Sequence, residues 1–402
     1  MPVSDGHTDF FNNPAAGVYY YNSSEPGWQQ ITNEDLDIIT GYVTKYPLAT
    51  TVSYVGSLNT GDLNRTDLIR TTTPNNFGWN LIGNPYPSAV DWDLVLRDNV
   101  NATMYLRKSN GSIAYYVAGG VGNPIETTGI IPPMQSFWAQ VTQGVPGNSY
   151  GSVYFSNAYR LHAQQALYKT INYPIVRLRA SNSYYSDETV ILFNDMATSA
   201  FDAAYDAYKM YSQNNQHPQL YSLSSLSEEL AINSIKFENT HLIVPLKFTS
   251  PENALHTLDA FEISNMDNNI TIHLEDRKTN QMQDLKIFNE YKFVHNNTDD
   301  GNRFYLHFNY SGSTSAHNLN LGSNNQTNIY ANNTSIYISF LNIKGEQYNV
   351  HIYNLLGQLL YNERISDTKN LHKIDMSNAY AHYIVHVFND NYSHKEKLTI
   401  FK

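Results

Sequence analysis

Cysteine is absent from the 402-residue sequence, so neither disulfide bonds nor thiolate metal sites are available to it. No run of about 18 apolar residues occurs either, which excludes a membrane-spanning helix. The first ten residues, MPVSDGHTDF, lack the basic start and the apolar stretch of a signal peptide. We therefore expect either a cytoplasmic protein or a portion of a longer, exported one.

Charged residues are scarce, at 15% of the sequence, whereas Tyr and Phe are frequent, with 32 and 17 copies. Aromatic side chains suit a pleated, half-buried surface, and the Asn, Ser, Thr and Gly between the apolar runs favour turns. The composition thus predicts an all-β protein. The chain is too long for one ordinary core, which predicts about two to four domains.

The formal net charge of −11 is unevenly distributed. Residues 325–402 contain seven Lys or Arg and six Asp or Glu, a net +1, which leaves −12 on the first 324 residues. Nucleic-acid binding needs basic stripes that neutralise phosphates, so the acidic body argues against a nucleic-acid partner. An extracellular surface or weak calcium sites would suit it.

Short strand candidates separated by Gly, Pro and Asn turns fill residues 1–165 and predict a β-sandwich domain. A second sandwich is predicted over 166–312, where alternating stretches such as YPIVRLRAS continue the pattern. Inside it, the Ala-rich stretch 199–211 favours a short helix or a turn, with Asp202 and Asp206 four residues apart on one solvated face.

Residues 313–327 are rich in Ser, Asn and Gly, which predicts a linker. Residues 328–402 then read as strand after strand. Alternation places Tyr348, Val350 and Ile352 on one face of a strand. Six or seven short strands in fewer than 80 residues predict a small immunoglobulin-like sandwich.

Four sequence motifs follow one another in this last unit: the strand and turn VHIYNLLGQLLY from 350, IDMS from 374, HYIVHV from 382, and a Lys-bearing final strand. Together they resemble the C-terminal sorting domain of type IX secretion cargo, found in Bacteroidota. Where that family has Gly two residues before Tyr383, this sequence has Ala381. The residues that match the family's motifs are Ile352, Tyr353, Asn354, Gly357, Gln358, Asp375, Tyr383, Val385, Lys395 and Lys397, with Lys402 at the end of the final strand.

The resemblance implies passage through the inner membrane by an ordinary signal peptide, followed by export across the outer membrane. It implies three partners: the outer-membrane type IX translocon, its shuttle protein and a sortase. The sortase of such systems usually removes the domain and links the cargo to surface lipopolysaccharide. The implied location is therefore extracellular, at the cell surface and anchored to the outer membrane.

Physical reasoning agrees with this interpretation. A signal at the C-terminus is read only after synthesis ends, so it should be a folded module on a flexible tether. Gly357 suits a tight hairpin turn because glycine adopts positive φ without a steric penalty. The alternative is a third immunoglobulin-like domain that merely has Gly at a turn.

The first two units also resemble known secreted proteins. GWNLIGNPYPSAVDWD at 78–93 and VSDGHTDFF at 3–11 are similar to a β-rich segment of large Bacteroidota surface proteins. The stretch from ETVILFND to PQLYSLS is similar to the sandwich that often precedes the sorting domain. These resemblances imply tandem antiparallel β-sandwich domains followed by a C-terminal immunoglobulin-like sorting domain. They also imply that the domain over 1–165 lacks its N-terminal part, because MPVSDG resembles the middle of such a domain.

Catalytic motifs are missing: the sequence has no His-Glu-x-x-His, Gly-x-Ser-x-Gly, phosphate-binding loop or dinucleotide fingerprint. His382 and His386 have the spacing of zinc ligands on a helix. On a strand, however, they would lie about 13 Å apart, too far to share one metal ion. We predict no enzymatic activity and no cofactor other than calcium, although a triad of distant residues stays open.

Two places offer oxygen ligands to a calcium ion. Asp91 and Asp93, two residues apart in an extended segment, could reach one cation or pair with Arg97. Asp299, Asp300 and Asn302 form the second place, an oxygen-rich turn. The alternative for both is structural, because Asp and Asn side chains bond the local backbone in turns.

Three aromatic residues, Trp79, Tyr86 and Trp92, could form a sugar-stacking platform, although we favour core positions for the two tryptophans. The sequence therefore predicts a secreted cell-surface protein whose body is adhesive or structural and binds a surface glycan or another surface protein. The alternative is a carbohydrate-binding accessory region of a larger secreted enzyme.

Overall fold

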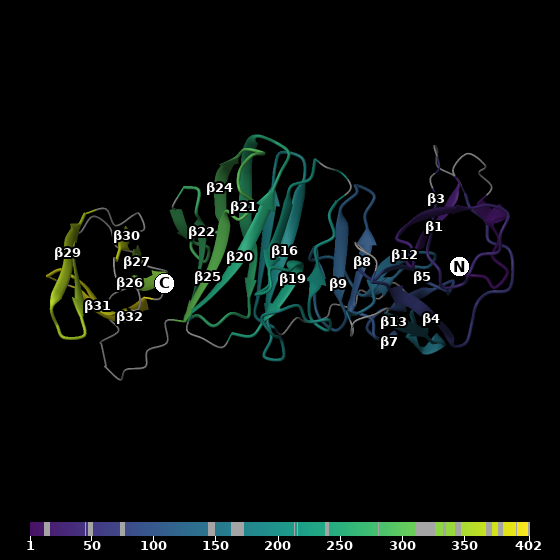
Figure 1. Ribbon diagram of the computed structural model, residues 1–402, viewed down its shortest axis with the longest axis horizontal. Coiled ribbons are helices and arrows are strands. Elements are labelled where there is room, and N and C mark those ends of the chain that lie inside the picture. Colours follow the sequence, from purple (N-terminus) through teal and green to yellow (C-terminus); the bar gives the residue numbers. More distant parts are fainter. Residues whose placement is uncertain are drawn as a thin grey trace. The chain divides into compact units, whose positions relative to one another are not determined.

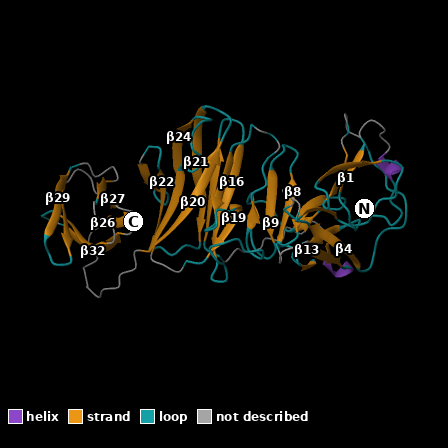
Figure 2. Ribbon diagram, in the orientation of Figure 1, coloured by secondary structure: helices purple, strands orange, loops and turns teal. Residues whose placement is uncertain are grey.

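A computed structural model shows a protein built almost entirely of strands (Figure 2). Its helical elements, within the described residues, are two short 3₁₀ helices, η1 (Thr8–Phe11) and η2 (Asn157–Tyr159). The all-β prediction is confirmed. The structure describes residues 1–11, 17–44, 46, 51–72, 77–143, 149–161, 173–212, 214, 216–237, 241–279, 281–310, 326–332, 335–341, 347–366, 372–376, 381–390 and 392–400.

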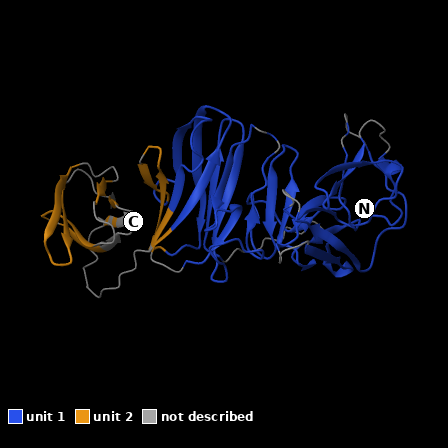
Figure 3. Ribbon diagram, viewed as in Figure 1, with its two compact units in different colours: residues 1–239, 243–267, 286–306 blue, residues 240–242, 268–285, 307–402 orange. Residues whose placement is uncertain are grey.

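The chain divides into two compact units (Figure 3). Unit 1 comprises residues 1–239, 243–267 and 286–306, and unit 2 comprises residues 240–242, 268–285 and 307–402. Strands β20 (His241–Thr249) and β25 (Phe304–Tyr310) each have residues in both units. Figure 1 labels the elements in chain order.

The N-terminal part of unit 1 contains four antiparallel sheets, with orders β2-β1-β3, β10-β9-β8-β12-β5, β11-β6-β14 and β4-β13-β7. Their strands are β1 (Val18–Asn22), β2 (Gly27–Ile31), β3 (Tyr42–Thr44), β4 (Leu63–Arg70), β5 (Trp79–Gly83), β6 (Ala89–Asp91), β7 (Leu96–Asp98), β8 (Thr103–Arg107), β9 (Ile113–Val117), β10 (Gly122–Asn123), β11 (Ile130–Ile131), β12 (Ser136–Gln140), β13 (Ser149–Phe155) and β14 (Arg160–Leu161).

A second sheet region of unit 1 has the order β20-β18-β19-β16-β15-β21-β24, with β17 paired to β19. Its pairs are antiparallel except β16 with β19, which run parallel. The strands not yet given are β15 (Ile175–Ser181), β16 (Ser186–Phe193), β17 (Ala207–Tyr208), β18 (Gln219–Leu223), β19 (Glu229–Ile235), β21 (Ala254–Ser264) and β24 (Glu290–His295).

One hydrophobic core of unit 1 includes side chains from both sides of the predicted boundary at residue 165. Tyr105 and Tyr115, from the five-stranded sheet, pack with Ile175, Val190 and Leu192 of the following strands. All five side chains are buried, so the two sheets enclose a shared apolar layer. The predicted division into separate sandwiches at this residue stays a prediction.

Of the helix or turn predicted over 199–211, the structure has a turn and not a helix. The stretch forms one turn and then strand β17, which pairs with β19. The backbone N–H of Asp202 donates to Asp206 Oδ2 at 2.7 Å, and that of Ser234 donates to Asp206 Oδ1 at 2.6 Å. Sheet pairing and these bonds to a buried carboxyl outweigh the helix propensity of the alanines, which favours a helix only weakly.

Asp206 is therefore not part of a solvated face. Its side chain is fully buried, and desolvation raises its pKa to about 8, against the opposing effect of the two backbone N–H donors. The negative charges of Asp202 and Glu228 raise the pKa further. Burial therefore favours the neutral, protonated form of this carboxyl.

Unit 2 contains the antiparallel pair of β22 with β23 and two sheets with orders β26-β27-β30 and β29-β28-β31-β32. The predicted linker over 313–327 lies outside the described residues except for its last two. The strands of unit 2 are β22 (Ile270–Asp276), β23 (Gln281–Asp284), β26 (Gln326–Asn332), β27 (Ser335–Leu341), β28 (Tyr348–Asn354), β29 (Leu359–Ile365), β30 (His372–Asp375), β31 (Ala381–Phe388) and β32 (Ser393–Ile400).

Candidate functional site

The four-stranded sheet of unit 2 carries most of the predicted sorting motif. Ile352, Tyr383 and Val385 point to one side of it and are buried. Burial of each such side chain stabilises the fold by roughly 1.5–3 kcal/mol. The cluster that they form is Ile329, Ile336, Ile338, Tyr348, Val350, Ile352, Ile365, Ile374, Tyr383, Val385 and Val387. All its members belong to the predicted sorting domain, so this domain has a hydrophobic core of its own.

The turn between β28 and β29 is fixed by the side chain of Asn354. Asn354 Oδ1 accepts hydrogen bonds from the backbone N–H groups of Leu356 and Gln358, both at 3.0 Å. Its Nδ2 donates to Gln358 Oε1 at 2.7 Å, and the Gly357 N–H donates to the Asn354 carbonyl at 3.0 Å. Gly357 has φ +80°, as the sequence predicted for a residue that closes this hairpin.

Replacement of Gly357 by Val should destabilise the hairpin by about 1–2 kcal/mol, because a β-branched residue is strained at positive φ. A Cβ atom at residue 357 would meet nothing within 4 Å, so the loss would come from the backbone alone. Gly357→Asn is the matched control, since Asn tolerates this conformation. Amide hydrogen exchange along β28 and β29 in the full chain would measure the difference. Equal protection in the Val variant and the wild type would contradict the turn assignment.

Asp375 joins two strands of the smaller sheet. Its Oδ1 accepts a hydrogen bond from Ser335 Oγ at 2.6 Å and lies 3.1 Å from Lys373 Nζ. These two neighbours lower the pKa of the Asp375 carboxyl. Because Ser335 belongs to β27 and Asp375 to β30, this motif residue has a structural role.

The other face of the four-stranded sheet is partly exposed and combines aromatic with basic residues. His351 Nδ1 and the Tyr353 hydroxyl are 2.9 Å apart, and the rings of His386 and Phe388 stack with centroids separated by 4.4 Å. Burial, Lys395 and His351 lower the pKa of His386. The motif lysines Lys395 and Lys397 are exposed on β32, whereas Lys402 lies outside the described residues.

Sequence reasoning missed four leucines around the turn. Leu355, Leu356, Leu359 and Leu360 are exposed to 54%, 85%, 47% and 48%. The sequence could have indicated this exposure. Side chains of a strand alternate between two faces, so the four leucines of LLGQLL cannot all point into the core. These leucines lie beside the motif residues Asn354, Gly357 and Gln358.

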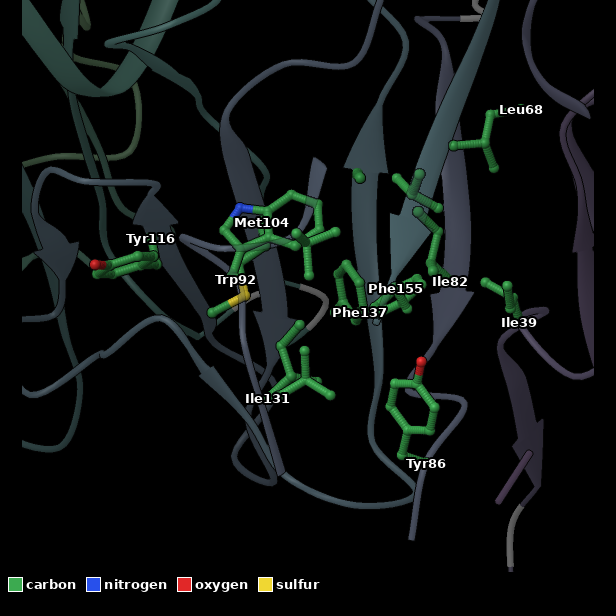
Figure 4. Close-up of a cluster of buried hydrophobic side chains, with 14 of the residues drawn as sticks. Ile39, Leu68, Ile82, Tyr86, Trp92, Met104, Tyr116, Ile131, Phe137 and Phe155 are labelled. Atoms are coloured by element: carbon green, nitrogen blue, oxygen red, sulfur yellow. The ribbon is translucent and has the colours of Figure 1, made fainter. Parts of the chain in front are cut away.

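The predicted sugar platform is wrong because two of its three members are in the core (Figure 4). Tyr86 and Trp92 are fully buried, and each polar group has a backbone acceptor: Gly61 O for the Tyr86 hydroxyl and Ala102 O for Trp92 Nε1, at 2.6 and 2.7 Å. Trp79 is half-buried and packs edge-on against a tyrosine ring. The core positions favoured from the sequence hold for Trp92 fully and for Trp79 in part.

The first predicted calcium place is occupied by local hydrogen bonds. Asp91 Oδ1 accepts from the Asp93 N–H at 3.0 Å, and Asp93 Oδ1 accepts from the Gly119 N–H at 2.7 Å. Arg97 Nη1 donates to the Trp92 carbonyl, and its guanidinium lies over the Trp92 ring.

The second place is similar. Asp299 Oδ2 accepts from the Asn296 N–H at 2.9 Å, and Asp300 Oδ1 accepts from the Asn302 N–H at 2.9 Å. Across the described part of the chain, no group of three or more His, Asp or Glu is arranged to hold a metal ion. Calcium at Asp91 and Asp93 or at this turn stays a prediction.

The motif residues, the separate core and the turn geometry together are typical of one class of protein domain. Residues 323–401 match the family described as "Secretion system C-terminal sorting domain". The chain is therefore a secreted protein with a type IX sorting domain at its C-terminus, and it is attached to the cell surface. No helix in the described residues is long and apolar enough to cross a membrane.

The chain belongs to the family described as "Domain of unknown function (DUF8693)", which matches residues 101–308, more than half of its length. No curated protein matches the chain. Among solved structures, a β-glucuronidase from Ruminococcus gnavus in complex with uronic isofagomine is 7% identical, with a TM-score of 0.14. That match covers 96% of this chain, which spans 43% of the enzyme's length.

Proposed function

We propose that the body, residues 1–310, is a non-enzymatic module that the cell displays for adhesion or as a structural surface component. The observation that supports this proposal is that buried charged side chains of the body pair with other residues of the body. Arg177 is fully buried, and its Nε and Nη1 donate to Glu262 Oε2 and to the Gly122 carbonyl, both at 2.5 Å. Lys209 is buried in a salt bridge with Asp187. Such paired groups hold strands together, which is a structural use of buried charge.

The size of a cavity in the body supports the same proposal. Tyr173, Leu192 and Tyr205 line it together with the turn at 117–121. Its volume of about 50 Å³ is well below the ~300–1,000 Å³ of typical ligand sites. A module of this kind would recognise its target on its outer surface.

The sorting domain implies contact with the secretion machinery, and we infer that its partners are the outer-membrane translocon, the shuttle protein and a sortase. The sequence resemblance supports these partners, a source among the Bacteroidota and an immunoglobulin-like fold for this domain. Two sheets that enclose one core fit such a sandwich.

A second candidate function is carbohydrate binding, because three aromatic rings meet at the surface of the body. Tyr21, Trp28 and Trp138 contact one another edge-on, with centroids 4.8–5.7 Å apart. Trp28 is 44% exposed on β2. An exposed indole beside polar side chains is a surface on which a sugar ring can stack.

A glycan array probed with the full chain separates the two candidates. If the second holds, Trp28→Ala should weaken glycan binding about tenfold or more, since loss of a central Trp typically costs ~2 kcal/mol. Tyr184→Ala, at an exposed tyrosine, should leave it unchanged. An array without binding would reject carbohydrate recognition and leave the adhesive or structural function. Turnover of any array glycan or peptide by the full chain would contradict the non-enzymatic proposal.

A further inference from the structure

The three-stranded sheet β2-β1-β3 has a core face and an outer face. On the core face, Tyr20 and Tyr42 pack against a hydrophobic cluster that contains Val18 and Ile31. Successive side chains of a strand point to opposite faces, so the neighbours of Tyr20 along β1 belong to the outer face. This outer face holds large side chains that lie outside the cluster.

Aromatic and amide side chains occupy the outer face. The register places Gln30 opposite Tyr19 and Trp28 opposite Tyr21, so these four side chains project to the same side of the sheet. The Tyr19 hydroxyl donates to Gln30 Oε1 at 3.4 Å, and the ring of Trp138 contacts those of Tyr21 and Trp28. Trp28 and Gln30 are exposed, whereas the other three are partly buried. These five residues form what we name the aromatic–amide face.

Charged residues do not occur in the three strands, whose sequences are VYYYN, GWQQI and YVT. The surrounding sequence is acidic, because residues 1–44 contain no Lys or Arg. Their acidic residues are Asp5, Asp9, Glu25, Glu34, Asp35 and Asp37. Glu25, in the turn between β1 and β2, is the charged residue nearest to Trp28 along the chain. An anionic ligand would therefore find no cation in this segment, and its carboxylates would repel such a ligand at low salt.

Uncharged sugars have the chemistry that this face can recognise. A pyranose ring presents C–H groups that pack on an aromatic ring, and its hydroxyls pair with neutral donors and acceptors. Trp28 and Gln30 lie two residues apart on β2, about 7 Å along the strand, a distance that one sugar ring and its hydroxyls span. The Gln30 amide has both a carbonyl acceptor and N–H donors for those hydroxyls.

We propose that the aromatic–amide face binds an uncharged oligosaccharide, with one sugar ring stacked on Trp28 and its hydroxyls hydrogen-bonded to the Gln30 amide. Tyr19 orients this amide through its hydroxyl, and the edge-on contacts of Tyr21 and Trp138 fix the Trp28 ring. This assignment rests on the second candidate function, glycan binding, and adds to it the class of glycan and the residue that selects it.

The test measures binding of the full chain to uncharged and anionic sugars on one array. The uncharged probes are cellohexaose, mannohexaose and xylohexaose, and the anionic probes are the hexamers of galacturonate and guluronate. At least one uncharged probe should bind, at least about tenfold more tightly than either anionic probe at low salt. Its affinity should change little at about 1 M salt, because no ion pair contributes to the binding.

Variants of Gln30 separate its role from that of the aromatic rings. Gln30→Ala should bind the uncharged probe about fivefold more weakly, as expected for the loss of neutral hydrogen bonds. Gln30→Lys should gain salt-sensitive binding of the anionic probes. The matched control is Gln29→Ala, because Gln29 is also an exposed amide but projects to the core face, where it accepts from the Tyr20 hydroxyl at 2.7 Å. It should bind like the wild type, and unchanged thermal unfolding of each variant would exclude misfolding.

Different results would overturn different statements. If the wild type binds no sugar on the array, glycan binding itself is wrong, and the inference falls with it. If the anionic probes bind as tightly as the uncharged ones, or if Trp28→Ala loses binding while Gln30→Ala does not, glycan binding stands and the inference is wrong. A wild-type dimer that Trp28→Ala abolishes without any change in sugar binding would assign the face to a second copy of the chain and overturn the inference.

Discussion

Deletion of residues 325–402 should abolish display of the remaining chain on the cell surface and leave it in the periplasm. The deletion removes every member of the sorting-domain core, from Ile329 to Val387. It leaves the cores of unit 1 complete, since none of their residues lies beyond 306. The truncated chain should therefore fold and accumulate, but without the label that the export machinery reads. Protease treatment of intact cells, followed by detection of the body, measures the outcome.

Two comparisons make this result specific. The Leu226→Gln variant of the full chain should reach the surface normally, because it changes one exposed residue of the body. Residues 311–402 fused to an unrelated periplasmic protein should carry that protein to the surface. Surface display of the truncated chain, with the fused protein retained in the periplasm, would remove the sorting function from this domain.

The parts of the sorting domain that sequence predicted well depend on local patterns. Alternation alone placed Tyr348, Val350 and Ile352 on one face, and the structure buries all three. The positive φ of Gly357 follows from the turn chemistry of the residues around it. Which side chains of a strand are buried can be predicted without knowing the neighbouring strands, because successive side chains alternate between its two faces.

The errors came from contacts between residues distant in the sequence. The stretch that contains Asp206 has helix propensity, yet the Ser234 N–H, 28 residues away, donates to the Asp206 carboxyl and β19 pairs with the strand that follows. The sequence offers Tyr86 and Trp92 as members of a sugar platform, although it favours a core position for Trp92. Only the assembled sheets show that both side chains face inward. Propensity is a weak prior, and tertiary contacts override it.

Trp92 has the contacts of a residue on which the body's core depends. Its ring packs edge-on against Phe137 with centroids 5.2 Å apart, and Figure 4 shows it beside Met104. Its Nε1 donates to the Ala102 carbonyl at 2.7 Å, and the guanidinium of Arg97 lies over the ring at 4.6 Å. Its removal would therefore leave a cavity, take one of two hydrogen bonds from the Ala102 carbonyl, which also accepts from the Ala118 N–H, and leave a cation without its aromatic contact.

Trp92→Ala should consequently lower the free energy of unfolding of the body by about 3–5 kcal/mol, a large share of the ~5–15 kcal/mol that stabilises a typical domain. Trp28→Ala, at the partly exposed tryptophan, should cost less than about 1 kcal/mol. Denaturant unfolding of both variants, followed by circular dichroism in the far ultraviolet, gives the comparison. An unchanged midpoint for Trp92→Ala together with lost glycan binding would restore the sugar platform and contradict the buried position. A large loss of stability would show that any binding defect of this variant reflects unfolding of the body, because the indole itself is out of reach of a ligand.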